Sequence, residues 1–238
     1  MRNRPALFTL GVILFFVALG LADRGVQLHG QLVLGAITWV VLLAAMRPLS
    51  TERRLQTLLV VLVATGMEVV GSVLWGVYTY RLHNLPMFIP PAHGLVYLSG
   101  IALASVARVR LVVGLAAIGS IGWGLAGLTV LPRLDVAGAV GVPLLCLFLW
   151  RSRVRASYAG VFLVVAALEL YGTSIGTWRW AAELPGLGIP DGNPPSGVAS
   201  GYVWFDVMAL LVAPALLAAG RMIVPARRWG PPSTAENG

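Results

Sequence analysis

The sequence predicts an all-α integral membrane protein of about eight transmembrane helices. Three observations lead to this fold class. Hydrophobic residues make up 58% of the 238 residues and charged residues only 11%, whereas soluble domains carry about 25% charged residues. The apolar residues gather in runs of the length that crosses a bilayer as a helix. All 17 basic residues are arginines, and they stand in short clusters between these runs.

Each expected span is an apolar run that lies between short segments of charged or turn-forming residues. In chain order, the runs are residues 6–22, 31–46, 55–77, 93–107, 111–131, 136–150, 156–178 and 202–224. The segments between them contain arginine, proline, glycine or aspartate. A span needs about 20 residues, so the shorter second, fourth and sixth runs have the least defined ends. The first run lacks a small-residue cleavage signal before Asp23, and we expect a retained helix there.

Arginine placement predicts the orientation of these spans. With the N-terminus in the cytoplasm, 13 of the 17 arginines fall on the cytoplasmic side, and the outer side keeps only Arg24, Arg81, Arg133 and Arg179. This asymmetry obeys the positive-inside rule, and one span more or fewer would destroy it. We therefore expect a multi-pass protein of the cell membrane, of the bacterial inner-membrane type, with both termini cytoplasmic. Residues 229–238 are polar and predict a disordered tail.

The third and seventh runs share an ordered pattern about 100 residues apart. Each holds a glutamate, two glycines and an aromatic pair, followed by a proline-rich loop; the two sets are Glu68, Gly71, Gly76, Tyr78 and Tyr80, and Glu169, Gly172, Gly176, Trp178 and Trp180. Four spans per half would give both halves the same orientation, as in parallel-repeat transporters. We expect two parallel four-helix repeats, residues 1–110 and 111–228. Chance similarity between apolar sequences is the alternative.

Glu68 and Glu169 are the principal candidates for catalysis. Both are expected just beyond the membrane midplane, on the outer side, at matching depth. A carboxylate there costs a few kcal/mol unless it is protonated or paired, so it is a functional candidate by default. The structural alternative is a protonated glutamate that is hydrogen-bonded to neighbouring helices.

Asp206 and His93 are the other two candidates for catalysis. Asp206 is expected about one turn inside the outer end of the last span, and an interfacial ion pair with Arg179 or Arg81 is its structural alternative. His93 opens the fourth span, where a histidine bonded to the backbone at the helix end is equally compatible with the sequence.

The outer segments 78–92 and 179–201 are rich in proline, glycine and aromatic residues. Irregular backbone at membrane depth is tolerated only where protein or a cavity covers it. We therefore expect both segments to fold back and cap a cavity. Its predicted substrate-binding residues are Tyr78, Tyr80, Arg81, Trp178, Arg179, Trp180, Asn193 and Trp204. An interfacial belt of tryptophan and tyrosine, with snorkelling arginines, is the alternative.

Such a pocket indicates acid–base chemistry on a lipophilic molecule. Two close carboxylates in a dry site do not both ionise readily, so one serves as an acid and the other as a base. Aromatic faces stabilise a carbocation, which suits protonation of an alkene or epoxide. The expected partners are an isoprenoid or other lipophilic small molecule and membrane lipids, with no nucleic acid.

At these residues the chain resembles the membrane-bound carotenoid hydratases, carotenoid biosynthesis proteins that add water to terminal isoprenoid double bonds. That family carries a membrane glutamate followed by glycines and a Gly-x-Tyr-x-Tyr element, and the similar residues here are Glu68, Gly71, Gly76, Tyr78 and Tyr80. It also carries an acidic residue, Gly-x-Trp-x-Trp and Gly-Ile-Pro-x-x-Asn, and the similar residues here are Glu169, Gly176, Trp178, Trp180, Gly188, Ile189, Pro190 and Asn193.

This chain also departs from the family pattern. The first motif is shorter and lacks the Pro-Phe before its glycine, and glutamate stands where the family has Asp-Pro. The resemblance covers roughly a quarter of the chain. It implies acid–base chemistry on an isoprenoid, which is the activity of a cofactor-independent lyase, hydratase or cyclase.

Two other functions stay open. The first is a proton-coupled transporter with Glu68 and Glu169 at a repeat interface, although the inner halves of the spans hold few polar residues. The second is a non-catalytic lipid-binding or assembly subunit. Haem, nucleotide and flavin motifs are absent, so we expect no cofactor. His93 and three carboxylates could form a hard-cation site, but no spacing specifies one, so no metal ligand is predicted. The single cysteine, Cys146, excludes a disulfide framework, and the oligomeric state is left open.

Overall fold

The computed structural model describes residues 4–223, except for the side chains of residues 203, 204, 206 and 220–223. Within this range the chain forms eight α-helices, a π-helical segment and four short strands. The helices are α1 (Arg4–Gly25), α2 (Leu28–Met46), α3 (Thr51–Glu68), α4 (Ile89–Val106), α5 (Val109–Thr129), α6 (Val136–Arg151), α7 (Arg155–Ile175) and α8 (Val198–Ile223). The π-helical segment η1 (Val69–Trp75) continues α3.

The prediction of a multi-pass membrane protein is confirmed at this level. In the described part, seven helices are long and apolar enough to cross a membrane, counting α3 and η1 as one. The remaining helix, α6, has 16 residues and contains Pro143. Many large apolar side chains of these helices face outward, which suits a surface in contact with lipid.

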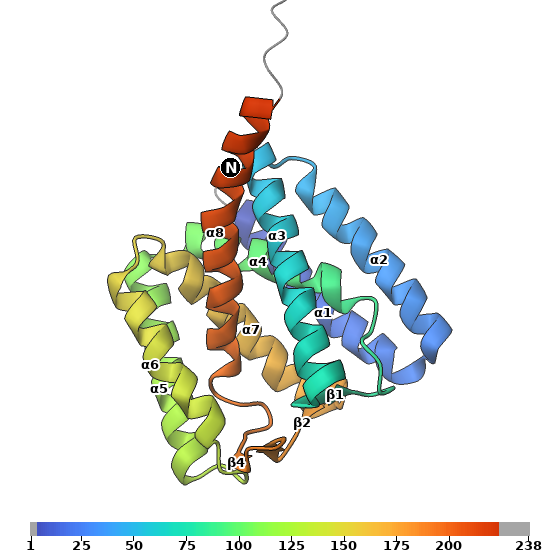
Figure 1. Cartoon of the computed structure of the whole chain (residues 1–238), viewed down its shortest axis with the longest axis vertical. Helices are drawn as coiled ribbons and strands as arrows, with labels where there is room; N and C mark the ends of the chain where they lie inside the picture. Colours follow the sequence, from blue (N-terminus) through green and yellow to red (C-terminus); the bar gives the residue numbers. More distant parts are fainter. Residues whose placement is uncertain (1–3, 224–238) are drawn as a thin grey trace, which may run out of the picture.

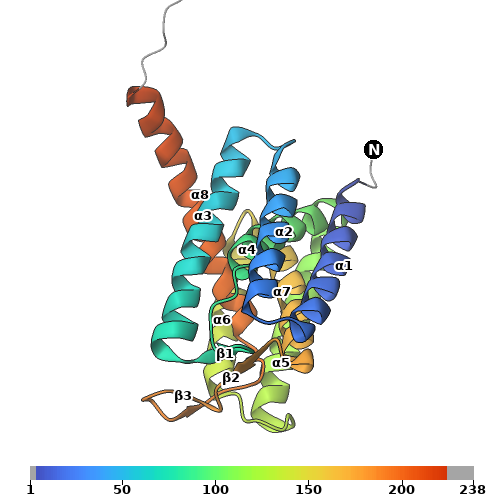
Figure 2. The same ribbon diagram turned by 90° about the vertical axis from the view of Figure 1, so that its right-hand side faces the viewer.

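Alternate crossings bring the connections to two opposite ends of the bundle (Figures 1 and 2). The links α2–α3, α4–α5 and α6–α7 lie toward one end, together with both ends of the described chain. The strands and the α1–α2 and α5–α6 links lie at the other end, which we call the ribbon end. Arginine clusters such as Arg53-Arg54 belong to the first end, and its assignment to the cytoplasm stays a prediction.

Four helices form the centre of the bundle. Helix α3 packs against α4 and α8, and α7 packs against the same two helices. The crossing of α4 and α7 is close because Gly100 and Gly160 face each other, and a side chain at Gly160 would overlap with the Gly100 carbonyl. The two halves therefore contact each other symmetrically: the contact of α3 with α4 corresponds to that of α7 with α8, and the contact of α3 with α8 corresponds to that of α7 with α4. The first helix of each half departs from this symmetry, because α1 packs mainly on α4 whereas α5 packs on α6 and α7.

Two short antiparallel ribbons cover the ribbon end, where only irregular loops had been expected. Strand β1 (Tyr78–Tyr80) pairs with β2 (Trp178–Trp180), so that Tyr78 lies opposite Trp180 and Tyr80 opposite Trp178. Strand β3 (Glu183–Leu184) pairs with β4 (Ile189–Pro190). The prediction was also wrong about the start of the fourth span, because α4 begins at Ile89, with prolines in its first turn.

The π-helical segment gives the join between α3 and β1 the same geometry as the join between α7 and β2. Both joins into the strands end on a glycine in the left-handed region, Gly76 (φ 76°) and Gly176 (φ 77°). Gly71 and Gly76 are five positions apart, whereas Gly172 and Gly176 are four apart. A π-turn takes up one residue more than an α-turn. The Val77 amide therefore donates to the Gly71 carbonyl (2.8 Å) just as the Thr177 amide donates to the Gly172 carbonyl (2.9 Å).

Candidate functional site

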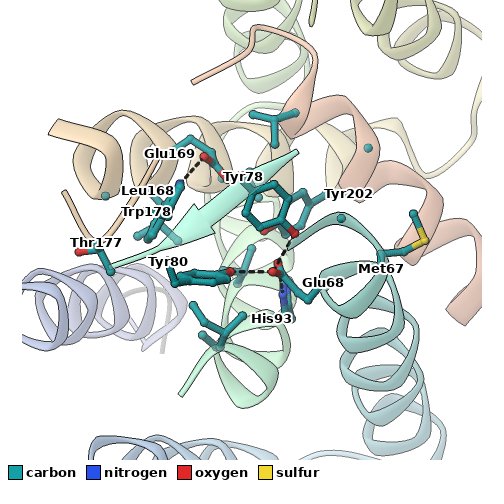
Figure 3. A pocket seen from close by; sticks show the side chains of 18 of the residues that line it. Met67, Glu68, Tyr78, Tyr80, His93, Leu168, Glu169, Thr177, Trp178 and Tyr202 are labelled. Carbon is teal, nitrogen blue, oxygen red and sulfur yellow. Dashed lines mark hydrogen bonds and ion pairs between the residues drawn. The ribbon is translucent and has the colours of Figure 1, made fainter. Parts of the chain in front are cut away.

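A cavity of about 350 Å³ lies inside the ribbon end of the bundle. Residues from α1, α3, η1, α4, α7, α8, β1 and β2 line it, and most of them are apolar or aromatic. Its titratable lining residues include Glu68, His93, Glu169 and Tyr202 (Figure 3). The structure thus brings two of the predicted acids and the predicted histidine to one cavity.

Glu68, the last residue of α3, is surrounded by hydrogen-bond donors. Its Oε2 accepts from the hydroxyls of Tyr78 (2.8 Å) and Tyr80 (2.6 Å), and both tyrosines point from β1 toward it in Figure 3. Burial, reinforced by the Glu68 charge, raises the pKa of both tyrosines well above the usual value of 10.0. Both hydroxyls therefore keep their protons and act as donors.

His93 completes the surroundings of Glu68. Its Nε2 lies 3.1 Å from Glu68 Oε1, and because a carboxylate oxygen only accepts, Nε2 carries the proton when Glu68 is ionised. The His93 ring packs against Tyr202 and Phe205 of α8, with centroid separations of 5.4 and 6.1 Å. The histidine thus bonds to a buried carboxyl group in the cavity, not to the backbone at the helix end.

Glu169 on α7 is held by tryptophans in the way that Glu68 is held by tyrosines. Its Oε2 accepts from the indole N–H groups of Trp178 (2.8 Å) and Trp180 (3.2 Å). Among the described residues, no donor reaches its other oxygen, Oε1. The Glu169 residue is 6% exposed and lines the same cavity as Glu68.

The β1–β2 ribbon presents one face to this cavity because side chains alternate along a strand. Tyr78, Tyr80, Trp178 and Trp180 all line the cavity. Their rings lie across the ribbon from one another. The ring centroids are 4.5 Å apart for Tyr78 and Trp180, and 6.2 Å apart for Tyr80 and Trp178. We call these four side chains the aromatic lid. It covers the ribbon end of the cavity and holds both glutamates.

Two glycines make room for the lid, each three residues after its glutamate. A methyl group at Gly172 would overlap with the Trp178 ring, and one at Gly71 would lie 3.0 Å from the Tyr78 ring. The spacing places each glycine on the same helix face as its glutamate. The sequence pattern of glutamate, glycine and aromatic pair is therefore a local packing unit: the ring crosses the glycine to reach the carboxyl group.

The cavity reaches the lateral surface of the bundle beside η1. Met67, Val70 and Trp75 line the cavity, yet their side chains are also exposed. Gly201 at the start of α8 lines the cavity and is exposed as well. These exposed lining residues belong to helices long and apolar enough to span a membrane, so the cavity has an exposed edge along η1 and the start of α8.

Arg81 does not belong to the cavity, which corrects its predicted role. Its Nε pairs with Asp23 Oδ2 at 3.2 Å, and its guanidinium also donates to the carbonyls of Asp23 and Val26. Asp23 in turn accepts from Gln31, which accepts from Asn84. Arg81 therefore ties the end of β1 to the corner between α1 and α2.

Arg179 and Asn193 also lie outside the cavity lining. Arg179 is exposed opposite Thr79 on the other face of the ribbon, as strand alternation requires. Asn193 is exposed, and its Oδ1 accepts from the Trp180 amide at 2.9 Å. It therefore positions β2 and does not line the cavity described here. The side chains of Asp206 and Trp204 fall outside the described part of the structure, so their predicted roles stay predictions.

Three buried aspartates were missed by the sequence reasoning. Asp23 is fully buried, Asp135 is 1% exposed and Asp191 is 2% exposed. Asp135 caps α6, accepting from the Gly138 amide (2.9 Å), and also accepts from the amides of Gly192 (3.1 Å) and Ser196 (2.7 Å). Only its position directly before the sixth run signals such a cap.

Asp191 differs from Asp135 in having a free oxygen. Its Oδ2 is buried without a hydrogen-bond partner in the described residues. Burial, and next the charge of Asp135, raise the pKa of Asp191 from 3.8 to about 7, against the opposing effects of the Gly192 amide and Arg133. Arg133 itself donates to the carbonyls of Trp180 and Ala181, so this cluster supports the strand β2 from outside the cavity.

Comparisons with known proteins identify no relative of this chain. No protein-family model, no curated protein and no solved structure matches this chain. Among the described residues, no three side chains of histidine, cysteine, aspartate or glutamate stand together as metal ligands would.

Proposed function

We propose that this chain is an intramembrane enzyme that protonates an alkene of an isoprenoid or other lipophilic substrate, leading to hydration or cyclisation. The observation that carries the proposal is the pair Glu68 and Glu169, which reach one apolar cavity from different helices. Each is anchored by two aromatic side chains of the lid. Carboxyl groups kept at membrane depth, at a cost of a few kcal/mol, are a mark of function.

The lid supports a carbocation mechanism. Protonation of an alkene creates a cation with no polar group to solvate it, and aromatic faces attract such a charge by about 0.5–2 kcal/mol each. Tyr78, Tyr80, Trp178 and Trp180 contribute four rings to the cavity, and Tyr202 and Phe205 add two more. Water-excluded surroundings also protect the cation from unselective capture.

The lateral opening supports a lipophilic substrate. A molecule dissolved in the bilayer reaches the cavity past Met67 and Val70 without crossing the polar interface. Most of the lining beyond the carboxyl groups is apolar or aromatic, which favours a hydrocarbon chain over a polar solute. The proposed location is therefore the cell membrane, with substrate supplied from the lipid.

A duplicated ancestry is part of the same proposal. Residues 1–110 and 111–228 would be parallel repeats, each supplying one glutamate, one accommodating glycine and one aromatic pair. The matched left-handed glycines Gly76 and Gly176 and the exchangeable packing of α3, α4, α7 and α8 support it. The π-helical segment accounts for the one additional residue between Gly71 and Gly76 compared with Gly172 and Gly176.

Substitution of the two glutamates tests the proposal. The protein is produced in a host whose membranes contain an acyclic polyene, and the lipid extract is analysed by liquid chromatography and mass spectrometry. Hydration adds the mass of one water, and cyclisation changes retention at constant mass. Glu68→Gln and Glu169→Gln should each lower product formation by at least about 100-fold, since acid–base groups contribute about 10²–10⁴-fold. The matched control is Glu183→Gln, because Glu183 is exposed on β3.

Full activity of both glutamine variants would end the acid–base proposal. Equal losses in Glu183→Gln would mean that the loss reflects folding and not chemistry. The proposed reaction would also be contradicted if folded, abundant wild-type protein left the mass and the retention time of the polyene unchanged.

One observation favours a proton-coupled transporter as the second candidate. The inner half of the bundle is not purely apolar: Tyr97, one turn beyond His93 on α4, accepts from Arg53 (3.1 Å) and donates to Gln56 (3.3 Å). Polar groups thus continue from the cavity toward the arginine-rich end. Against this, the fully buried Ala64 and Leu95 lie between the two groups along α3 and α4. Acidification of proteoliposomes on addition of a solute, lost in Glu68→Gln, would favour transport.

A further inference from the structure

We infer that the two glutamates have fixed and different roles: Glu169 is the proton donor, and Glu68, held by His93 and two tyrosines, is the base. This assignment rests on the proposed function. The geometry that separates the roles is the distribution of hydrogen-bond donors over the four carboxyl oxygens.

Glu68 is built to be the ionised member of the pair. Three donors reach it, and both of its oxygens are engaged, Oε2 by Tyr78 and Tyr80 and Oε1 by His93. Hydrogen bonds donated to a carboxylate favour its charged form. A protonated Glu68 would have to place its own hydrogen among these three donors, which leaves few free directions around the group.

Glu169 is built to be the neutral member. Both tryptophan N–H groups reach the same oxygen, Oε2, and in the described part of the chain no donor reaches Oε1. A neutral carboxyl group suits this arrangement, with Oε2 as the carbonyl oxygen and Oε1 carrying the proton. One negative charge is already present on Glu68 in the same low-dielectric cavity, which further disfavours ionisation of Glu169.

The two indole groups also prepare Glu169 to release its proton. As the proton leaves Oε1, negative charge develops over both oxygens, and the N–H groups of Trp178 and Trp180 strengthen their bonds to it. Donors placed in advance where charge develops lower the barrier of such a step. The tryptophans are therefore positioning residues for the acid, as well as aromatic faces of the cavity.

The proposed step balances as follows. The π electrons of the alkene form a new C–H bond with the proton of Glu169 Oε1, and the O–H bonding pair remains on the Glu169 carboxylate. The other alkene carbon becomes a cation. In hydration, a water oxygen bonds to this cation and one water proton passes to Glu68; in cyclisation, a second alkene attacks and a neighbouring C–H proton passes to Glu68. Either proton is strongly acidic, so the stabilised carboxylate of Glu68 is a sufficient base.

The cycle closes when a proton returns to Glu169 from Glu68. The net reaction consumes water in hydration and nothing in cyclisation, and no oxidant or reductant is needed. The histidine keeps Glu68 oriented while its charge changes, because His93 Nε2 lies at hydrogen-bond distance from Oε1. The crowded surroundings of Glu68 make its protonated form short-lived, which favours transfer of the proton onward to Glu169.

Infrared spectroscopy of the full-length protein in lipid nanodiscs tests the assignment without substrate. A protonated carboxyl group gives a C=O stretching band that moves in D₂O, and loss of a hydrogen bond to the carbonyl oxygen moves this band to higher frequency. We expect the band to move in Trp178→Phe, and to stay unchanged in Tyr80→Phe. Both variants keep an aromatic ring. The spectra are recorded in an Asp191→Asn background, which removes the carboxyl group outside the cavity that would otherwise contribute near neutral pH.

The outcomes separate the role assignment from the proposed function. A band that moves in Tyr80→Phe, or that does not move in Trp178→Phe, overturns the assignment, as does the absence of any carboxylic acid band. Each of these results leaves the product assay on Glu68→Gln and Glu169→Gln unaffected. Conversely, the expected spectra could be observed while the glutamine variants still form product at the wild-type rate. This result would contradict the enzyme proposal but would still support a protonated Glu169.

Discussion

Buried carboxyl groups in this protein differ in how many donors they receive. Asp23 and Asp135 receive donors on both oxygens, and they tie helices and loops together. Glu169 and Asp191 each keep one oxygen without a donor from the described residues. A buried polar group left unpaired costs about 1–3 kcal/mol, and more when it is charged, so the oxygens without donors mark the groups whose protonation state matters.

At this scale we predict that Asp191 makes stability depend on pH. The folded state raises its pKa from 3.8 to about 7, so between these values the folded protein binds a proton that the unfolded chain has released. The contribution is complete below about pH 4 and is lost as pH rises toward 7. Thermal unfolding in detergent should show a midpoint at pH 5.5 that is higher by at least about 2 °C than at pH 7.5, the shift that roughly 1 kcal/mol gives in a chain of this size.

The control for this pH dependence is Asp191→Asn. The amide keeps the shape of the side chain and does not titrate, so the midpoint should become flatter over the same range. An equally steep dependence in the variant would assign the effect to another group and contradict the role of Asp191.

At the scale of elements, the joins from helix to ribbon are the main result. Helices α3 and α7 deliver their aromatic pairs through the same hydrogen bond, Val77 to Gly71 and Thr177 to Gly172, although the first join has one residue more. The π-helical segment absorbs that residue where π-turns in proteins are often functional. The ribbon itself is too short to be stable alone, and the glutamates and Arg81 hold it.

We therefore predict that one residue of η1 is dispensable. Deleting Val73, an exposed residue of η1, should give an α-helical join like that of α7 and leave Tyr78 in contact with Glu68. Product formation should stay within about tenfold of wild type, and the unfolding midpoint in detergent should change little.

The matched control is deletion of Leu62, which is also exposed but lies within α3. Removing a residue there rotates Glu68 by about 100° relative to the preceding helix, since a turn takes 3.6 residues. Activity should fall by at least about 100-fold, as for removal of the acid–base group itself. Equal losses in both deletions would show that the extra residue of η1 is essential.

At the scale of the whole molecule, we predict the membrane orientation. In a Cys146→Ser background, a single cysteine at Glu183 on β3 should react with a membrane-impermeant maleimide in intact cells. A single cysteine at Ser152, in the link between α6 and α7, should react only after permeabilisation, because its neighbours Arg151 and Arg153 favour the cytoplasmic side. The reversed pattern would invert the proposed topology, and labelling of both sites in intact cells would contradict eight crossings.

Some features of the site could be predicted because they are local in the chain. Glu68 lies ten residues before Tyr78, and Glu169 nine residues before Trp178, so helix, glycine and strand geometry bring each pair together. By contrast, Arg81 lies 58 residues from Asp23 and Asp135 lies 61 residues from Ser196. No periodicity signals such pairs, and for this reason the sequence could not show that Arg81 is bound to Asp23 and lies outside the cavity lining.

The amino-acid sequence by itself determined the membrane class, the positions of the helices and the two local units of glutamate, glycine and aromatic pair. Hydrophobicity and charge act on each segment separately, so these properties can be read along the chain. Only the tertiary structure decided that Tyr78 and Trp180 pair across about 100 residues, that both glutamates share one cavity, and that Arg81 binds Asp23. These contacts depend on which helices pack together, and packing is a property of the assembled bundle.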